Sequence, residues 1–83
     1  MNVLIHRHCR IRMPERGVSE EEIVQTVTEG ASRPAKLGRT EFRFEFDYNG
    51  VWRGTYYRRK RVTAIAVPAN AGWLVLTVIA RYY

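Results

Sequence analysis

Residues 48–83 carry six basic side chains and no acidic one. Residues 1–47 hold eight basic and eight acidic side chains, which cancel, so the formal net charge of +6 comes entirely from the C-terminal part. A basic region with aromatic residues among its cations suits a polyanion such as RNA, or an acidic protein partner, although the charge would equally serve solubility. The residues concerned are Trp52, Arg53, Tyr56, Tyr57, Arg58, Arg59, Lys60, Arg61 and Arg81.

Three side chains near the N-terminus, His6, His8 and Cys9, resemble the beginning of a metal site. The chain has no other histidine or cysteine, and a structural zinc needs about four ligands, so we expect neither a metal nor a cofactor. We expect His6 to cap or buttress a helix and Cys9 to lie on its buried side. One cysteine excludes an internal disulfide and favours a reducing, cytoplasmic setting, and the charged N-terminus argues against secretion.

The apolar segment 62–83 must form the centre of the fold. Residues 62–80 carry no charge, and their β-branched runs are separated by Pro68, Asn70 and Gly72. This pattern predicts two buried strands joined by a turn, with a membrane-spanning segment as the alternative. Exposed strand edges would allow a homodimer.

Upstream of this segment, residues 40–48 alternate between apolar and charged side chains, which predicts a strand with one buried face. Asn49-Gly50 is a strong hairpin signal. A two-residue turn there would place Phe46 opposite Arg53 and Phe44 opposite Thr55. Residues 58–61 would then form the next tight turn.

Two helices are expected before these strands. Residues 6–13 fit a helix that ends or kinks at Pro14, with Ile5, Cys9 and Met13 on one side. Ser19 and Glu22 have the spacing of a capping box, which predicts a second helix ending at Gly30. The sequence therefore predicts one α+β domain over residues 1–83. Two N-terminal helices would pack on one face of a four-stranded antiparallel sheet, with residues 2–5 as a short edge strand and residues 31–39 as a loop or short extended segment.

The opening H-R-H-C-R-I-R-M-P-E-R-G-V-S-E-E-E-I resembles the H-x-x-x-R-M-x-E-R-G-I-S-x-x-x-I opening of a widespread family of small, uncharacterised bacterial proteins. The closing W-L-V-L-T-V-I-A-R-Y-Y resembles the final strand of that family. In length and order of elements the chain is similar to the RelE/ParE superfamily of toxins. RelE-type members cleave messenger RNA, usually at the ribosome, whereas ParE-type members poison DNA gyrase.

The RelE resemblance implies a metal-free endoribonuclease that acts on RNA or ribosome-bound messenger RNA and is neutralised by an acidic antitoxin. Arg43, Lys60 and Arg81 would hold the phosphate, and Glu45, Tyr82 or His6 would transfer protons. Trp52, Tyr56 and Tyr57 would stack on bases, although Tyr57 falls on the predicted core face. The side chains of Arg53, Arg58, Arg59 and Arg61 would contact the nucleic acid. Arg12 and Arg16 belong to the family-like opening and would serve either the site or an internal salt-bridge set.

The alternative is a non-catalytic module that binds RNA or a protein through the same surface. The chain lacks a C-terminal histidine and has Pro14 in its opening helix, unlike an ideal RelE enzyme. The charges of Glu41, Arg43 and Glu45 would also fit an ordinary cross-strand ladder.

Overall fold

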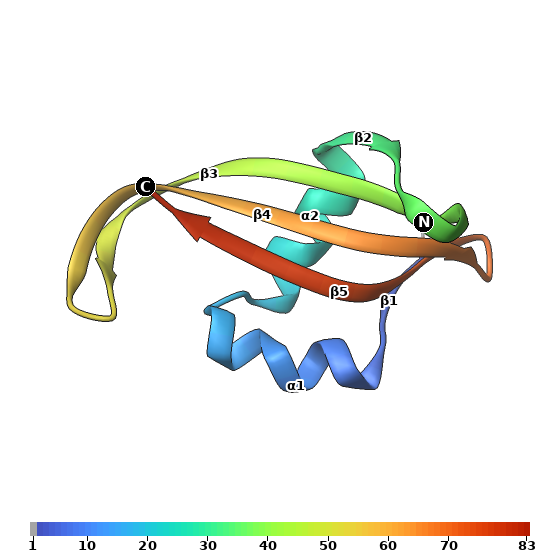
Figure 1. The fold of residues 1–83 in the computed structure, drawn as a ribbon, viewed down its shortest axis with the longest axis horizontal. Helices are drawn as coiled ribbons and strands as arrows, with labels where there is room; N and C mark the ends of the chain where they lie inside the picture. The colour runs from blue at the N-terminus through green and yellow to red at the C-terminus, as the bar shows by residue number, and fades with distance from the viewer. Residues whose placement is uncertain (1) are drawn as a thin grey trace.

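The computed structural model of the protein describes residues 2–83. Two helices lie on one side of a long, twisted sheet (Figure 1). In chain order the elements are β1 (Asn2–Ile5), α1 (Arg7–Arg16), α2 (Glu20–Glu29), β2 (Ala31–Pro34), the 3₁₀ turn η1 (Lys36–Gly38), β3 (Thr40–Trp52), β4 (Thr55–Ala69) and β5 (Gly72–Tyr82).

The sheet differs from the predicted one. It has five strands in the order β1-β5-β4-β3-β2, and β1 runs parallel to β5 while the other pairs are antiparallel. The prediction of a four-stranded antiparallel sheet is therefore wrong. Part of residues 31–39, for which a loop or short extended segment was predicted, forms β2. The strand predicted after residues 49–50 is divided, because Val51 and Trp52 extend β3 and residues 55–57 begin β4.

The turn between β3 and β4 lies at Arg53-Gly54, not at Asn49-Gly50. Phe46 pairs with Lys60 and Phe44 with Val62, and residues 58–61 lie within β4 instead of forming a turn. This register sets the phenylalanine side of β3 against the apolar side of β4, so burial along the whole ladder outweighs the local preference of the Asn-Gly pair. Asn49 keeps a left-handed φ of 47°, but within a β-bulge.

Both helices begin at a residue whose side chain caps the helix. The capping box of α2 is present, with the Glu22 amide donating to Ser19 Oγ at 3.1 Å and the Ser19 amide donating to Glu22 Oε1 at 2.9 Å. His6 caps α1, because its Nδ1 accepts from the His8 amide at 3.1 Å. Pro14 does not end α1, which continues to Arg16 and stops at Gly17 with φ 68°.

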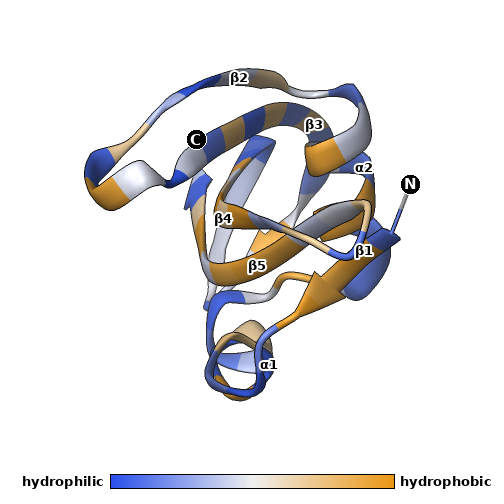
Figure 2. Ribbon diagram, turned by 90° about the vertical axis from the view of Figure 1, so that its right-hand side faces the viewer, coloured by the Kyte–Doolittle hydropathy of each residue, from blue (hydrophilic) through white to orange (hydrophobic). Residues whose placement is uncertain are grey.

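The core lies between the helices and the sheet. Helix α1 packs on β5, and α2 crosses β3 and β4. The side chains that face this interface alternate with outward-facing ones, and Figure 2 shows the alternation along β3 as bands of opposite hydropathy. Cys9 is 1% exposed, as predicted. The buried apolar residues are Cys9, Val18, Ile23, Val27, Phe42, Val62, Ala64, Ala66, Val75 and Val78.

Residues 62–83 form most of β4 and β5. Within residues 2–83, neither helix is long and apolar enough to cross a bilayer.

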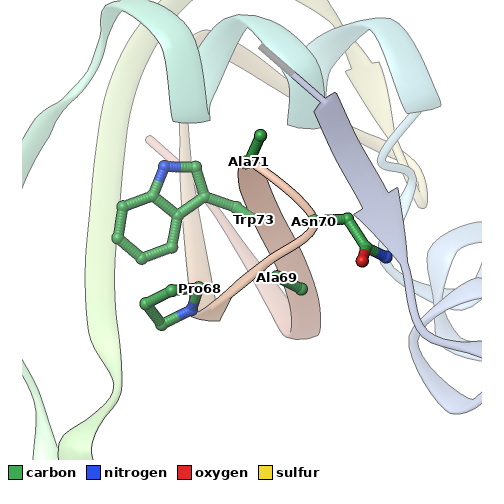
Figure 3. Close-up of a pocket in the computed structure, with 6 residues that line it drawn as sticks. Pro68, Ala69, Asn70, Ala71 and Trp73 are labelled. Carbon is green, nitrogen blue, oxygen red and sulfur yellow. The ribbon is translucent and has the colours of Figure 1, made fainter.

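The β4–β5 turn offers a prediction about stability. Figure 3 shows Asn70 and Ala71 at its tip, and both have positive φ, 47° and 60°, as a type I′ turn requires. An alanine in this region is strained by its Cβ. Ala71→Gly should therefore raise the free energy of unfolding by about 0.5–1 kcal/mol in urea denaturation. The control is Ala69→Gly in the adjacent strand, which should lower the free energy of unfolding. If both variants lowered the free energy of unfolding equally, the turn geometry would be contradicted.

Candidate nucleic-acid interface

The register of the sheet divides the predicted site residues between its two faces. Side chains alternate along a strand, so the residues paired with Lys60 face the helices and those paired with Arg61 face solvent. Lys60 pairs with Phe46 and Tyr82, whereas Arg61 pairs with Glu45 and Arg81. Glu45, Arg61 and Arg81 thus share the open face, and Lys60 and Tyr82 lie beneath the sheet.

Lys60 is enclosed by protein groups, with 3% of its surface exposed. Its Nζ donates to both carboxylate oxygens of Glu22, at 2.8 and 3.0 Å, and to the carbonyl oxygen of Gly17. The ammonium also lies 5.4 Å from the centre of the Tyr82 ring and 5.7 Å from that of Tyr48. All three ammonium protons have an acceptor, so the geometry gives Lys60 a structural role, linking β4 to the start of α2.

Tyr82 belongs to the same helix-facing cluster. Its ring stacks on Trp52, with centroids 4.9 Å apart and planes 15° apart, and its hydroxyl donates to the Arg16 carbonyl oxygen at 2.9 Å. Burial, together with nearby Tyr48, raises the pKa of Tyr82 to about 12. The phenol is therefore neutral at physiological pH and poorly suited to accept a proton there. Trp52, predicted to stack on bases, stacks on this tyrosine instead.

The tip of the β3–β4 hairpin curls toward the helix side of the sheet (Figure 1). Arg53 Nη2 donates to the Glu15 carbonyl oxygen at 2.6 Å, and its guanidinium lies 5.1 Å from the Trp52 ring centre. Tyr56 is 58% exposed and donates to Asn49 Oδ1 at 3.3 Å. Of these predicted contact residues, Tyr56 presents the most accessible ring.

On the open face, Glu45 connects Arg61 and Tyr83. Arg61 Nε donates to Glu45 Oε2 at 2.6 Å, and the Tyr83 hydroxyl donates to Glu45 Oε1. The Arg61 guanidinium also lies 5.6 Å from the centre of the Tyr83 ring. The hydrogen bond from Tyr83, together with Arg61, lowers the pKa of Glu45, which keeps the carboxylate ionised at neutral pH. Tyr83 was not among the predicted site residues, yet period-two alternation from Arg81 would have placed it on this face.

Arginine is in excess around this group. Arg61 lies directly opposite Arg81 on β5, a pairing of like charges that destabilises a sheet. Arg59 is paired with Asp47, at 2.8 Å. Arg43, Arg58 and Arg81 are exposed, and none has a carboxylate within salt-bridge distance in the described part of the chain. We call the set Arg43, Arg58, Arg59, Arg61 and Arg81 the arginine face.

The first-helix candidates lie away from the arginine face. His6 is the cap of α1, and Arg12 forms an ion pair with Glu15 at 3.2 Å on that helix. Arg16 Nη1 donates to the Val78 carbonyl oxygen at 2.8 Å, which ties α1 to β5. The family-like opening thus contributes contacts within the fold. Among residues 2–83, no three His, Cys, Asp or Glu side chains gather as a metal site would need.

Comparisons with protein-family models, curated protein sequences and solved structures returned no match, so the RelE/ParE relationship stays a prediction from the sequence.

Proposed function

We propose that the protein binds RNA through the arginine face and acts in the cytoplasm, where messenger RNA is translated. The observation that carries this proposal is the unneutralised charge: within residues 2–83, Arg43, Arg58 and Arg81 have no carboxylate partner. Arg81 also lies directly opposite Arg61 on the neighbouring strand, and Glu45 neutralises only Arg61 of this pair. A phosphate placed among these guanidinium groups would relieve their mutual repulsion and accept charge-assisted hydrogen bonds.

Tyr83 adds a second element of nucleic-acid recognition. Tyr83 is 45% exposed beside the arginines, which leaves a surface on which a base can stack. Stacking tolerates any base, and phosphate contacts carry no sequence information, so we expect binding of single strands with little sequence preference and strong dependence on salt. An acidic protein, including an antitoxin, would form ion pairs with the arginines but would not require Tyr83.

A metal-free endoribonuclease is the second candidate, favoured by the chain of hydrogen bonds through Glu45. In this proposal the Glu45 carboxylate takes the proton of a 2′-hydroxyl, whose oxygen attacks the adjacent phosphorus. The bond to the 5′-oxygen breaks, and that oxygen takes the Tyr83 proton while Arg61 and Arg81 stabilise the phosphate charge. The proton held by Glu45 then returns to Tyr83 along their hydrogen bond. The lowered pKa of Glu45 makes it a weak base and predicts slow cleavage.

Replacing Arg81 with alanine tests both candidates. Arg81→Ala should weaken binding of single-stranded RNA about tenfold, because one charge-assisted contact with phosphate is lost. The measurement is fluorescence anisotropy over a range of salt concentrations, where the slope of log affinity against log salt should fall by about 0.7. Arg7→Ala on the exposed side of α1 is the matched control and should bind as the wild type does.

The same proteins in a defined translation reaction, with and without ribosomes, separate binding from cleavage. Messenger RNA cuts that vanish in Arg81→Ala and in Glu45→Gln would establish the nuclease. Intact messenger RNA with salt-dependent binding would leave the non-catalytic module. Equal affinity of Arg81→Ala and wild type would exclude the arginine face as the binding surface.

A further inference from the structure

Two irregularities in the sheet meet beside the arginine face. The amides of Arg58 and Arg59 both donate to the carbonyl oxygen of Tyr83, at 3.1 and 2.8 Å, so two consecutive residues of β4 face one residue of the neighbouring chain segment. On the other side of β4, Asp47 pairs with Arg59 and Gly50 with Tyr57, which leaves an extra residue in β3. Bulges change the direction of side chains and are common next to functional sites.

The bulges shape a hollow of about 480 Å³ that opens to solvent, lined by Asp47, Asn49, Arg58, Arg59 and Tyr83. In a regular strand Arg58 and Arg59 would point to opposite faces, but here both consecutive arginines line the same hollow. Only one of them is neutralised, by the ion pair of Arg59 Nη1 with Asp47 Oδ1 at 2.8 Å.

We propose that this hollow is a subsite for one phosphate group of the bound RNA strand, and that Asp47 takes the place of the phosphate when RNA is absent. This inference rests on the proposed function and specifies where the RNA is held. The Asp47 side chain is 78% exposed, so it can leave Arg59 without disturbing the core. Arg58 supplies a second guanidinium, and the two together can bind a phosphate through several parallel hydrogen bonds.

Asn49 adds a neutral hydrogen-bond donor to the subsite. Asn49 Oδ1 accepts from Tyr56 at 3.3 Å, which leaves the amide NH₂ group as a donor for a phosphate oxygen. Arg61 lies two residues from Arg59 along β4, about 7 Å away on the same face. A single strand can therefore place one phosphate in the hollow and another between Arg61 and Arg81.

Two substitutions with opposite signs test the subsite, measured by anisotropy with a labelled single-stranded oligouridylate. Asp47→Asn removes the internal competitor and should tighten binding about threefold to tenfold. Arg58→Gln should weaken binding and lower the salt slope by about 0.7. Glu41→Gln and Arg33→Gln are the matched controls, because they form a similar ion pair at 3.0 Å on the same sheet. Neither control should change affinity.

The outcomes distinguish the subsite from the proposed function. If wild-type protein binds RNA but Asp47→Asn and Arg58→Gln behave like their controls, the subsite is overturned and RNA binding stands. If the wild type binds no RNA, the proposed function fails, and inorganic phosphate then tests the hollow by NMR. Saturable shifts of the Asn49, Arg58 and Arg59 amides, lost in Arg58→Gln, would support an anion site; their absence would overturn it.

Discussion

Lys60→Met is expected to lower the free energy of unfolding by about 3–5 kcal/mol, since removing one partner of a buried ion pair leaves the other uncompensated. The Lys60 side chain is 3% exposed, and its ammonium donates to Glu22 and to the Gly17 carbonyl oxygen. A domain of this size has a total stability of about 4–12 kcal/mol, so the variant would lose a large part of it. Chemical denaturation monitored by circular dichroism measures the change.

Two controls show whether the loss of stability in Lys60→Met comes from the buried ion pair. Lys36 is the other lysine of the chain and is exposed, so Lys36→Met should be almost neutral. Adding Glu22→Gln to Lys60→Met should restore part of the stability, because glutamine retains the capping box without an unpaired charge. If Lys60→Met were as stable as Lys36→Met, the ion pair of Lys60 with Glu22 would contribute nothing to stability. The predicted role of Lys60 in binding a phosphate would then have to be reconsidered.

Gly17→Ala is expected to lower the free energy of unfolding by about 3 kcal/mol, from a strained φ and from overpacking. Gly17 has φ +68°, and a Cβ there would lie 2.5 Å from Tyr82 Oη and 2.6 Å from the Trp52 ring. The added methyl group would separate Tyr82 from Trp52 and lift the hairpin tip from α1. Thermal unfolding and the tryptophan emission spectrum report the two effects.

A second glycine isolates the backbone contribution. Gly38 has a similar φ of +72°, and a Cβ there would meet nothing within 4 Å. Gly38→Ala should therefore cost only the conformational strain, about 1–2 kcal/mol. Equal losses at the two positions would show that the contact of Gly17 with Tyr82 and Trp52 contributes nothing to stability.

These two predictions concern residues beneath the sheet, whereas the functional predictions concern the face above it. Lys60 and Tyr82 were expected to act on RNA with Arg43, Glu45 and Arg81, but the fold sets them among protein contacts. A variant at Lys60 or Tyr82 that loses RNA cleavage would therefore need a stability measurement before its loss could be assigned to chemistry. Variants at Arg81 and Asp47, which are exposed, are the more direct tests of function.

Several features follow from sequence because neighbouring residues decide them. The Ser19–Glu22 capping box and the cap at His6 depend on contacts within one helical turn. The burial of Cys9 was predicted from its place on the apolar side of the helix, although the contacts that bury it come from the core. The alternation of Phe42, Phe44 and Phe46 with charged residues likewise predicts a strand with one buried face, because successive side chains of a strand point to opposite faces. The unbalanced charge of residues 48–83 is a property of composition and needs no structure.

Only the tertiary structure decided which candidate residues share a face. Asn49-Gly50 is the stronger local turn signal, but the turn forms at Arg53-Gly54 because that register sets the phenylalanine side of β3 against the apolar side of β4, with Phe42 buried and Phe46 partly buried against the core. The shift turned residues 58–61 from a predicted turn into a strand, sending Lys60 inward and Arg61 outward. The same register brought Glu45, Arg61 and Tyr83 together, and the bulge at Arg58 and Arg59 added a second arginine to the hollow. Such pairings depend on the burial of side chains along whole strands, and a short sequence motif cannot predict it.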